Sequence, residues 1–175
     1  MLKSSSQEKI QFVQTKYGKI WTATHGKPGK TPILVIHGGP GYPHFSIEGL
    51  RELAADRQVI FYDQLGCGLS EKPETTDFQN LEYLIEETGE VRKQLNLKKV
   101  VILGWSFGAV LAYETTIRNP DGIKALIFAS PLLDTAIWLK GAKENLATLP
   151  IAVQTVIREY EAGNTELEKE YQNAS

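Results

Sequence analysis

KKVVILGWSFGAVLAYE, residues 98–114, carries the strongest structural signal in the chain. It opens with an apolar run over 98–103 that is rich in β-branched residues, as expected of a buried strand, and after residue 108 it continues as a helix. Ser106 stands at the sharp turn between the two, where Gly104 and Gly108 remove the Cβ atoms that such a turn would crowd. G-x-S-x-G also occurs by chance, but the strand before it and the helix after it favour a nucleophilic serine at the carboxyl end of a strand.

Strand and helix patterns alternate on both sides of this turn. Strands are predicted at 10–15, 19–24, 32–37, 59–63 and 124–129, and helices at 47–55, 81–95 and from 109 to about 119. The later strands are apolar throughout and are separated by amphipathic helices, which is typical of a mostly parallel sheet covered by helices on both faces. The first two strands are joined closely enough, through Tyr17-Gly18, to form an antiparallel hairpin. The predicted fold class is therefore α/β.

After the last predicted strand the chain carries helical patterns only. Thr148 is predicted to cap a helix that has Pro150 in its first turn. We expect residues 1–131 to be the N-terminal part of an α/β core and residues 132–175 to be the beginning of a helical lid. Five glutamates of this lid region form either a solvated acidic face, which is the favoured interpretation, or a site for a cationic group: Glu159, Glu161, Glu166, Glu168 and Glu170.

The second motif, HGGPG at residues 37–41, lies at the end of another apolar strand. Open α/β sheets place their sites at such strand ends, and acyl transfer needs N–H donors around the reacting oxygen. We predict that the Gly39 N–H and the Phe107 N–H, the latter at a helix N-terminus, form an oxyanion hole. The alternative is a tight turn that requires glycine for its positive φ alone. The residues predicted to line the substrate pocket are Gly38, Pro40 and Trp105.

Other polar residues near these strand ends have structural interpretations. His37 is predicted to hydrogen-bond nearby loop backbone, and His44 to be a loop residue rather than a base. DQLGCGLS, residues 63–70, contains a G-x-G that invites a dinucleotide-binding interpretation, but it leads into more loop instead of opening a helix. Asp63 is therefore predicted to brace the loops by accepting backbone N–H bonds, and Cys67 to be a small packing residue.

Composition restricts the class of protein without identifying it. The net charge of −2 and the isoelectric point near 6.0 give no electrostatic reason to expect nucleic acid or a membrane surface as a partner. A single cysteine cannot form an internal disulfide, so a reducing compartment, the cytoplasm, is expected. No signal peptide and no run long enough to span a membrane is recognisable. No pattern predicts a metal site or a particular oligomer.

HGGPG, DQLGCGLS and GWSFG at these intervals resemble the motif series of the proline iminopeptidase family, α/β-hydrolase-fold serine peptidases. The resemblance covers essentially the whole chain. It implies that Ser106 is the nucleophile, that the N–H groups of Gly39 and Phe107 form the oxyanion hole, and that no cofactor is needed. It also implies release of an N-terminal residue, often proline, from short peptides. Family members recognise the free amino group with lid glutamates, which match no particular positions here.

The chain departs from the family pattern in its catalytic triad. The family order is nucleophile, acid, histidine, whereas all three histidines here precede Ser106: His25, His37 and His44. Beyond the helix that follows Ser106, the aspartates are Asp121, in the loop entering the last predicted strand, and Asp134, at the entrance of the lid, and neither lies after a later strand, where the family places its acid. We therefore expect the triad acid and histidine to lie outside this chain, which would be the N-terminal part of a longer enzyme. A serine hydroxyl without a base is a poor nucleophile, so we expect this part to be inactive alone.

Two classes of function remain open at this level. The first is a serine hydrolase that acts on a small peptide or, as its runner-up, on another small ester or amide. The second is a non-catalytic module that binds a ligand or partner through the same cleft. In either case the strand at 124–129 is expected to be an unpaired sheet edge, which makes this polypeptide marginally stable or prone to aggregate.

Overall fold

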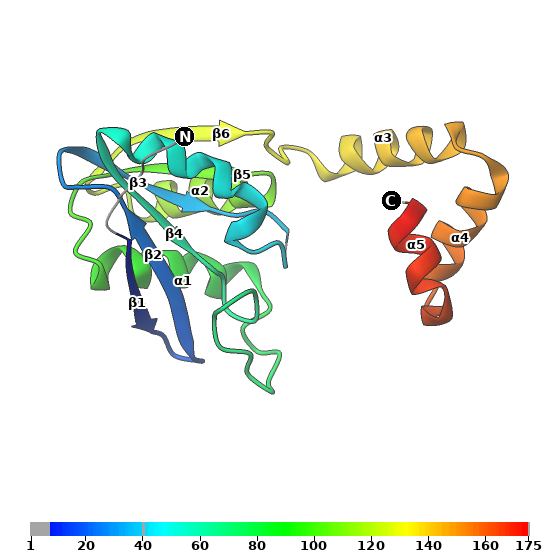
Figure 1. The fold of residues 1–175 in the computed structure, drawn as a ribbon, viewed down its shortest axis with the longest axis horizontal. Coiled ribbons are helices and arrows are strands. Elements are labelled where there is room, and N and C mark those ends of the chain that lie inside the picture. The colour runs from blue at the N-terminus through cyan, green and yellow to red at the C-terminus, as the bar shows by residue number, and fades with distance from the viewer. Residues whose placement is uncertain (1–7, 40, 175) are drawn as a thin grey trace, which may run out of the picture. The chain divides into compact units, whose positions relative to one another are not determined.

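The computed structural model describes residues 8–39 and 41–174, drawn in Figure 1. The chain divides into two compact units, Met1–Leu132 and Leu133–Ser175. The first unit is built on one sheet and the second contains helices only.

The sheet of the first unit has six strands in the order β1-β2-β4-β3-β5-β6. Their bounds are β1 Lys9–Gln14, β2 Lys19–His25, β3 Lys30–Ile36, β4 Arg57–Tyr62, β5 Val100–Trp105 and β6 Ile123–Ala129. β1 and β2 form the predicted antiparallel hairpin, and β2 also pairs antiparallel with β4. The pairs β4–β3, β3–β5 and β5–β6 are all parallel. The predicted α/β class with a mostly parallel sheet is confirmed.

Helical segments cover both faces of this sheet. Alternate residues of each strand point to opposite faces, so each face has its own apolar cluster. The α-helices α1 (Leu81–Gln94) and α2 (Phe107–Arg118) contact each other and share one core cluster with Leu34, Ile60 and Ile102. The strand residues that alternate with these point to the opposite face and form the second core cluster. The segment η1 packs against this second cluster through Ile47, Leu50 and Ala54.

The segment η1, His44–Ala55, differs from the predicted helix at 47–55. It is a 3-10 helix without a buried residue, interrupted at Ile47, whose φ of −127° is not helical. Leu53 in this segment is 41% exposed. Gly49 and the absence of a side-chain cap at Pro43 both weaken an α-helix at this position.

Strand β6 ends one side of the sheet and carries exposed apolar side chains, with Ile127 40% and Phe128 43% exposed. An unpaired, apolar strand edge is a template for pairing with another chain. We expect the chain to self-associate as its concentration rises, and Phe128→Lys to reduce that association severalfold by placing a charge on the edge. Light scattering over a concentration series measures this. Leu133→Lys, which changes an exposed leucine outside the sheet, is the control. Equal behaviour of the two variants would contradict the prediction.

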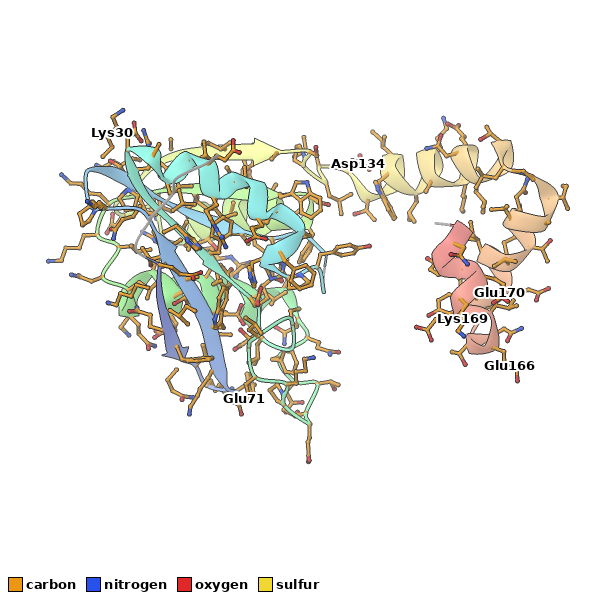
Figure 2. All side chains as sticks on the ribbon, viewed as in Figure 1. Lys30, Glu71, Asp134, Glu166, Lys169 and Glu170 are labelled. Carbon is orange, nitrogen blue, oxygen red and sulfur yellow. The ribbon has the colours of Figure 1, made fainter. Side chains whose placement is uncertain are left out.

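The second unit contains α3 (Thr135–Thr148), α4 (Ile151–Glu161), η2 (Thr165–Leu167) and α5 (Glu168–Ala174). Asp134, labelled in Figure 2, caps α3 by accepting N–H bonds from Ala136 and Ile137 at 2.8 and 3.0 Å. None of the helices in the described part of the chain combines the length and the apolar character that a bilayer crossing requires.

Two sequence predictions for α4 were wrong. Thr148 does not cap this helix but ends α3, because its hydroxyl donates to the Asn145 carbonyl at 2.7 Å within that helix. Pro150 precedes the first turn of α4 instead of lying in it. The carbonyl before Pro150, that of Leu149, accepts from the Gln154 amide at 2.8 Å, so a buried glutamine fastens the connection. All five glutamates considered for cation binding are exposed, which agrees with a solvated acidic face.

Candidate active site

Ser106 occupies a strained turn between β5 and α2. Its φ of 52° and ψ of −118° lie in a region that non-glycine residues rarely adopt. Backbone bonds hold it there: its N–H donates to Ala129 O at 3.0 Å, and its carbonyl accepts from Ala109 N at 3.0 Å and Leu132 N at 3.3 Å. The residue is half-buried, and its hydroxyl has no hydrogen-bond partner among the described residues. Among the described residues, this turn therefore leaves the Ser106 hydroxyl unpaired.

The two glycines of G-x-S-x-G are required by close backbone packing. A Cβ on Gly104 would lie 2.3 Å from Gly108 O, and one on Gly108 would lie 2.3 Å from Ile36 O and 2.5 Å from His37 O. The start of α2 thus lies directly against the end of β3. This contact brings the loop after β3 next to the serine.

Gly108→Ala should therefore destabilise the fold strongly. The new methyl group meets backbone atoms that cannot rotate away, so we expect a loss of about 3 kcal/mol in the free energy of unfolding. Urea titration followed by circular dichroism measures it. The matched control is Gly89→Ala in α1, where a Cβ meets nothing within 4 Å and helix propensity should add up to about 1 kcal/mol. Equal stability of the two variants would refute the packing argument.

The HGGPG loop lies beside the serine. A Cβ on Gly38 would lie 3.1 Å from Ser106 Cβ and 3.1 Å from Trp105 O. Gly39 follows with a φ of +122°, a conformation that side-chain-bearing residues avoid. Since Ile36 pairs with Gly104 in the sheet, both loops leave adjacent parallel strands at the same edge. Gly38 and Gly39 therefore lie at the sheet edge where α2 begins with Phe107. Pro40, also predicted to line the substrate pocket, lies outside the described residues.

Asp63 fastens the loop after β4 to the segment after HGGPG. Its buried carboxylate accepts from His44 N at 2.7 Å and Leu69 N at 2.8 Å, which confirms the predicted bracing role. It also contacts the His44 ring at 2.9 Å, a bond the sequence analysis did not predict. That ring stacks on Trp21 with centroids 4.2 Å apart.

Nearer the hairpin, Glu71 (labelled in Figure 2) exchanges hydrogen bonds with the Lys19 backbone.

None of the three histidines hydrogen-bonds to Ser106. His37 is fully buried, and its ring nitrogens contact Gly38 O at 2.8 Å and Gln64 N at 2.9 Å, as expected of a structural residue. Burial lowers its pKa, so the neutral ring is favoured. His25 is also buried. The described residues thus contain a candidate nucleophile without an adjacent base.

Glu87 is a buried carboxyl group beneath the DQLGCGLS loop that sequence reasoning missed. It is 1% exposed; Oε2 accepts from Leu65 N at 3.0 Å and Oε1 has no partner. Burial raises its pKa to about 8. The available signal was its position on the apolar face of α1, between Leu84 and Val91. Burial likewise raises the pKa of the half-buried Cys67 thiol, which argues against a reactive thiolate.

Comparisons with known proteins agree with this geometry. Residues 31–163 match the family described as the alpha/beta hydrolase fold. Two proline iminopeptidases are 44% identical over 143 residues (Heyndrickxia coagulans, 82% of this chain) and 40% identical over 147 residues (Clostridium botulinum, 83%). Among solved structures, proline iminopeptidase of Mycobacterium smegmatis has a TM-score of 0.78 at 27% identity, and VinJ 0.86 at 30%. Each alignment covers 95% of this chain and 58% of the other protein.

The chain belongs to the α/β-hydrolase fold family. Within it, the chain groups with the proline iminopeptidases, which confirms the resemblance carried by its three motifs. It spans about half the length of the curated relatives it matches, 50% of both the Heyndrickxia and the Clostridium protein.

Proposed function

We propose that this chain supplies the nucleophile and the oxyanion hole of a serine aminopeptidase that releases N-terminal residues, often proline, from small peptides. The observation that carries the proposal is the free Ser106 hydroxyl on a strained turn, with the glycine loop of Gly38 and Gly39 directly beside it. The relatives named proline iminopeptidase support the choice of peptides as substrates.

In the proposed reaction, Ser106 Oγ attacks the carbonyl carbon of the first peptide bond, and a histidine accepts the hydroxyl proton. The negative charge that develops on the carbonyl oxygen is stabilised by the N–H groups of Gly39 and Phe107. The first N–H groups of a helix have no partner within it, so the Phe107 N–H is available. When the C–N bond breaks, the leaving amine takes the proton from the histidine. Water then hydrolyses the ester on Ser106.

The triad acid and histidine are proposed to come from sequence outside residues 1–175. Two observations support this: the chain spans half of its relatives, and its histidines are engaged elsewhere. Without them, residues 1–175 should not hydrolyse peptides at a useful rate. His37, considered as a substitute base, is a poor choice because Gly38 and Gln64 occupy both ring nitrogens.

The test is an extended chain, in which residues 1–175 are joined to the part of the Heyndrickxia coagulans enzyme that the match leaves uncovered. We expect it to hydrolyse proline 4-nitroanilide but not N-acetylproline 4-nitroanilide, since an aminopeptidase requires the free amine. Residues 1–175 alone should cleave neither. Preference for the blocked anilide or for 4-nitrophenyl acetate would favour the amidase or esterase alternative. A folded extended chain that cleaves nothing would favour a non-catalytic binding module.

A further inference from the structure

A pocket of about 470 Å³ lies between the DQLGCGLS loop and the N-terminal turn of α1. All of its walls belong to the first unit of the chain. Its lining residues are Gly41, Gln64, Leu65, Gly66, Cys67, Phe78. The remaining ones are Gln79, Asn80, Leu81, Leu84 and Phe107. A volume of this size lies within the range of small-ligand pockets and has room for a large apolar side chain.

The wall of this pocket is uncharged. None of the lining residues is Asp, Glu, Lys, Arg or His, and aromatic and leucine side chains supply much of the surface. The Gln64 amide is turned to His37, donating to His37 O at 3.0 Å. Asn80 is also engaged, because its oxygen accepts from Tyr83 N at 2.9 Å to cap α1. The side-chain donors of Gln64 and Asn80 are thus engaged, and the wall, to which the exposed Gln79 also contributes, offers no charge to balance that of a charged occupant. An uncharged side chain is therefore favoured in this pocket.

The pocket adjoins the reacting centre through Phe107. This residue lines the pocket and follows Ser106, and its N–H is one of the two proposed oxyanion donors. A substrate whose carbonyl oxygen contacts that N–H lies at a residue that also forms part of the pocket wall. Gly41, from the loop that carries Gly39, closes the same wall.

We propose that this pocket binds the apolar side chain of the residue that follows the scissile bond. The proposal rests on the proposed aminopeptidase function and adds a preference on the leaving side. The released N-terminal residue bears an ammonium group, which an apolar wall without a carboxylate disfavours. The residue after the scissile bond has an uncharged amide nitrogen instead of an ammonium group. Its side chain alone therefore determines whether it binds in the pocket.

Cys67 makes the proposal testable on residues 1–175 themselves, since it is the only cysteine of the chain and lines the pocket. The rate of its modification by N-ethylmaleimide is measured with increasing N-acetylleucinamide, whose acetyl group replaces the scissile acyl group. At about four times the dissociation constant, we expect modification to slow about fivefold. N-acetylglycinamide, N-acetylaspartic acid amide and leucinamide, which carries the ammonium of an N-terminal residue, should protect little.

Two variants locate the protection. Leu81→Trp fills the pocket from its rim and should abolish protection, whereas Leu69→Trp, at a 59% exposed leucine outside the pocket, should retain it. Protection with this pattern supports the proposal. Absence of protection, equal protection by the charged analogues, or protection that survives Leu81→Trp overturns it. The assay is run on Ser106→Ala, so its outcome is independent of hydrolysis, and failure of the proposed function appears separately as inactivity of the extended chain.

Discussion

Ser106→Ala is expected to lower the rate at which the extended chain hydrolyses proline 4-nitroanilide by about a millionfold. Removing the nucleophile of a serine protease has an effect of this size, because the remaining groups of the triad act only through it. Substrate binding should be nearly unchanged, since the proposed oxyanion donors are backbone groups. The steady-state kcat measures the effect, with circular dichroism to show that the fold is retained.

Ser130→Ala is the matched control for that substitution. Ser130 also follows a strand and also has a positive φ, 45°, but it is exposed at the end of β6. The substitution Ser130→Ala should leave the kcat for proline 4-nitroanilide nearly unchanged. A comparable loss in both variants would show that the backbone turn, rather than the Ser106 hydroxyl, is what activity requires.

Stability of the chain is expected to fall as the pH rises from about 4.5 to about 8, because of Glu87. Burial raises the pKa of this carboxyl to about 8 in the folded state, against 4.5 for a free glutamate. Over that range the folded chain keeps a proton that the unfolded chain loses. The stabilisation is therefore complete below about pH 4.5 and is lost as the pH approaches 8, at up to about 1.4 kcal/mol per pH unit.

Glu87→Gln should remove this slope, because the amide stays neutral and its oxygen still accepts the Leu65 N–H. We expect the variant to be several kcal/mol more stable than the wild type at pH 8 and close to it at pH 4.5. Urea titrations at several pH values measure the difference. Glu86→Gln, at the exposed neighbour, should keep the wild-type slope. An unchanged slope in Glu87→Gln would contradict the burial argument.

Much of the core could be predicted because its signals are local. A run of β-branched residues, G-x-S-x-G and a helix pattern follow one another without a gap and predict β5, the turn and α2 in turn. The segment η1 and the capping of α4 were missed for the opposite reason. The sequence of η1 contains good helix formers, but its backbone is interrupted at Ile47 and no side chain caps its start. The Thr148 hydroxyl bonds the Asn145 carbonyl within α3 instead of capping α4.

The site was predictable where motifs stand at strand ends and not where distant segments meet. The sequence places Gly39 and Ser106 after separate strands, and the parallel pairing of β3 with β5 makes them neighbours. Nothing in the sequence pairs His44 with Asp63 or puts Glu87 under Leu65, because these contacts join loops and helices far apart in the chain. The pocket beside Phe107 could not be predicted for the same reason, because its wall combines residues from four separate parts of the chain.

The position of a covalent adduct tests most directly whether Ser106 is the nucleophile. The extended chain is treated with a fluorophosphonate, digested, and analysed by peptide mass spectrometry. We expect a single modified residue, Ser106, and no adduct after Ser106→Ala. An adduct on another residue, or none in an extended chain that still hydrolyses proline 4-nitroanilide, would show that Ser106 is not the nucleophile.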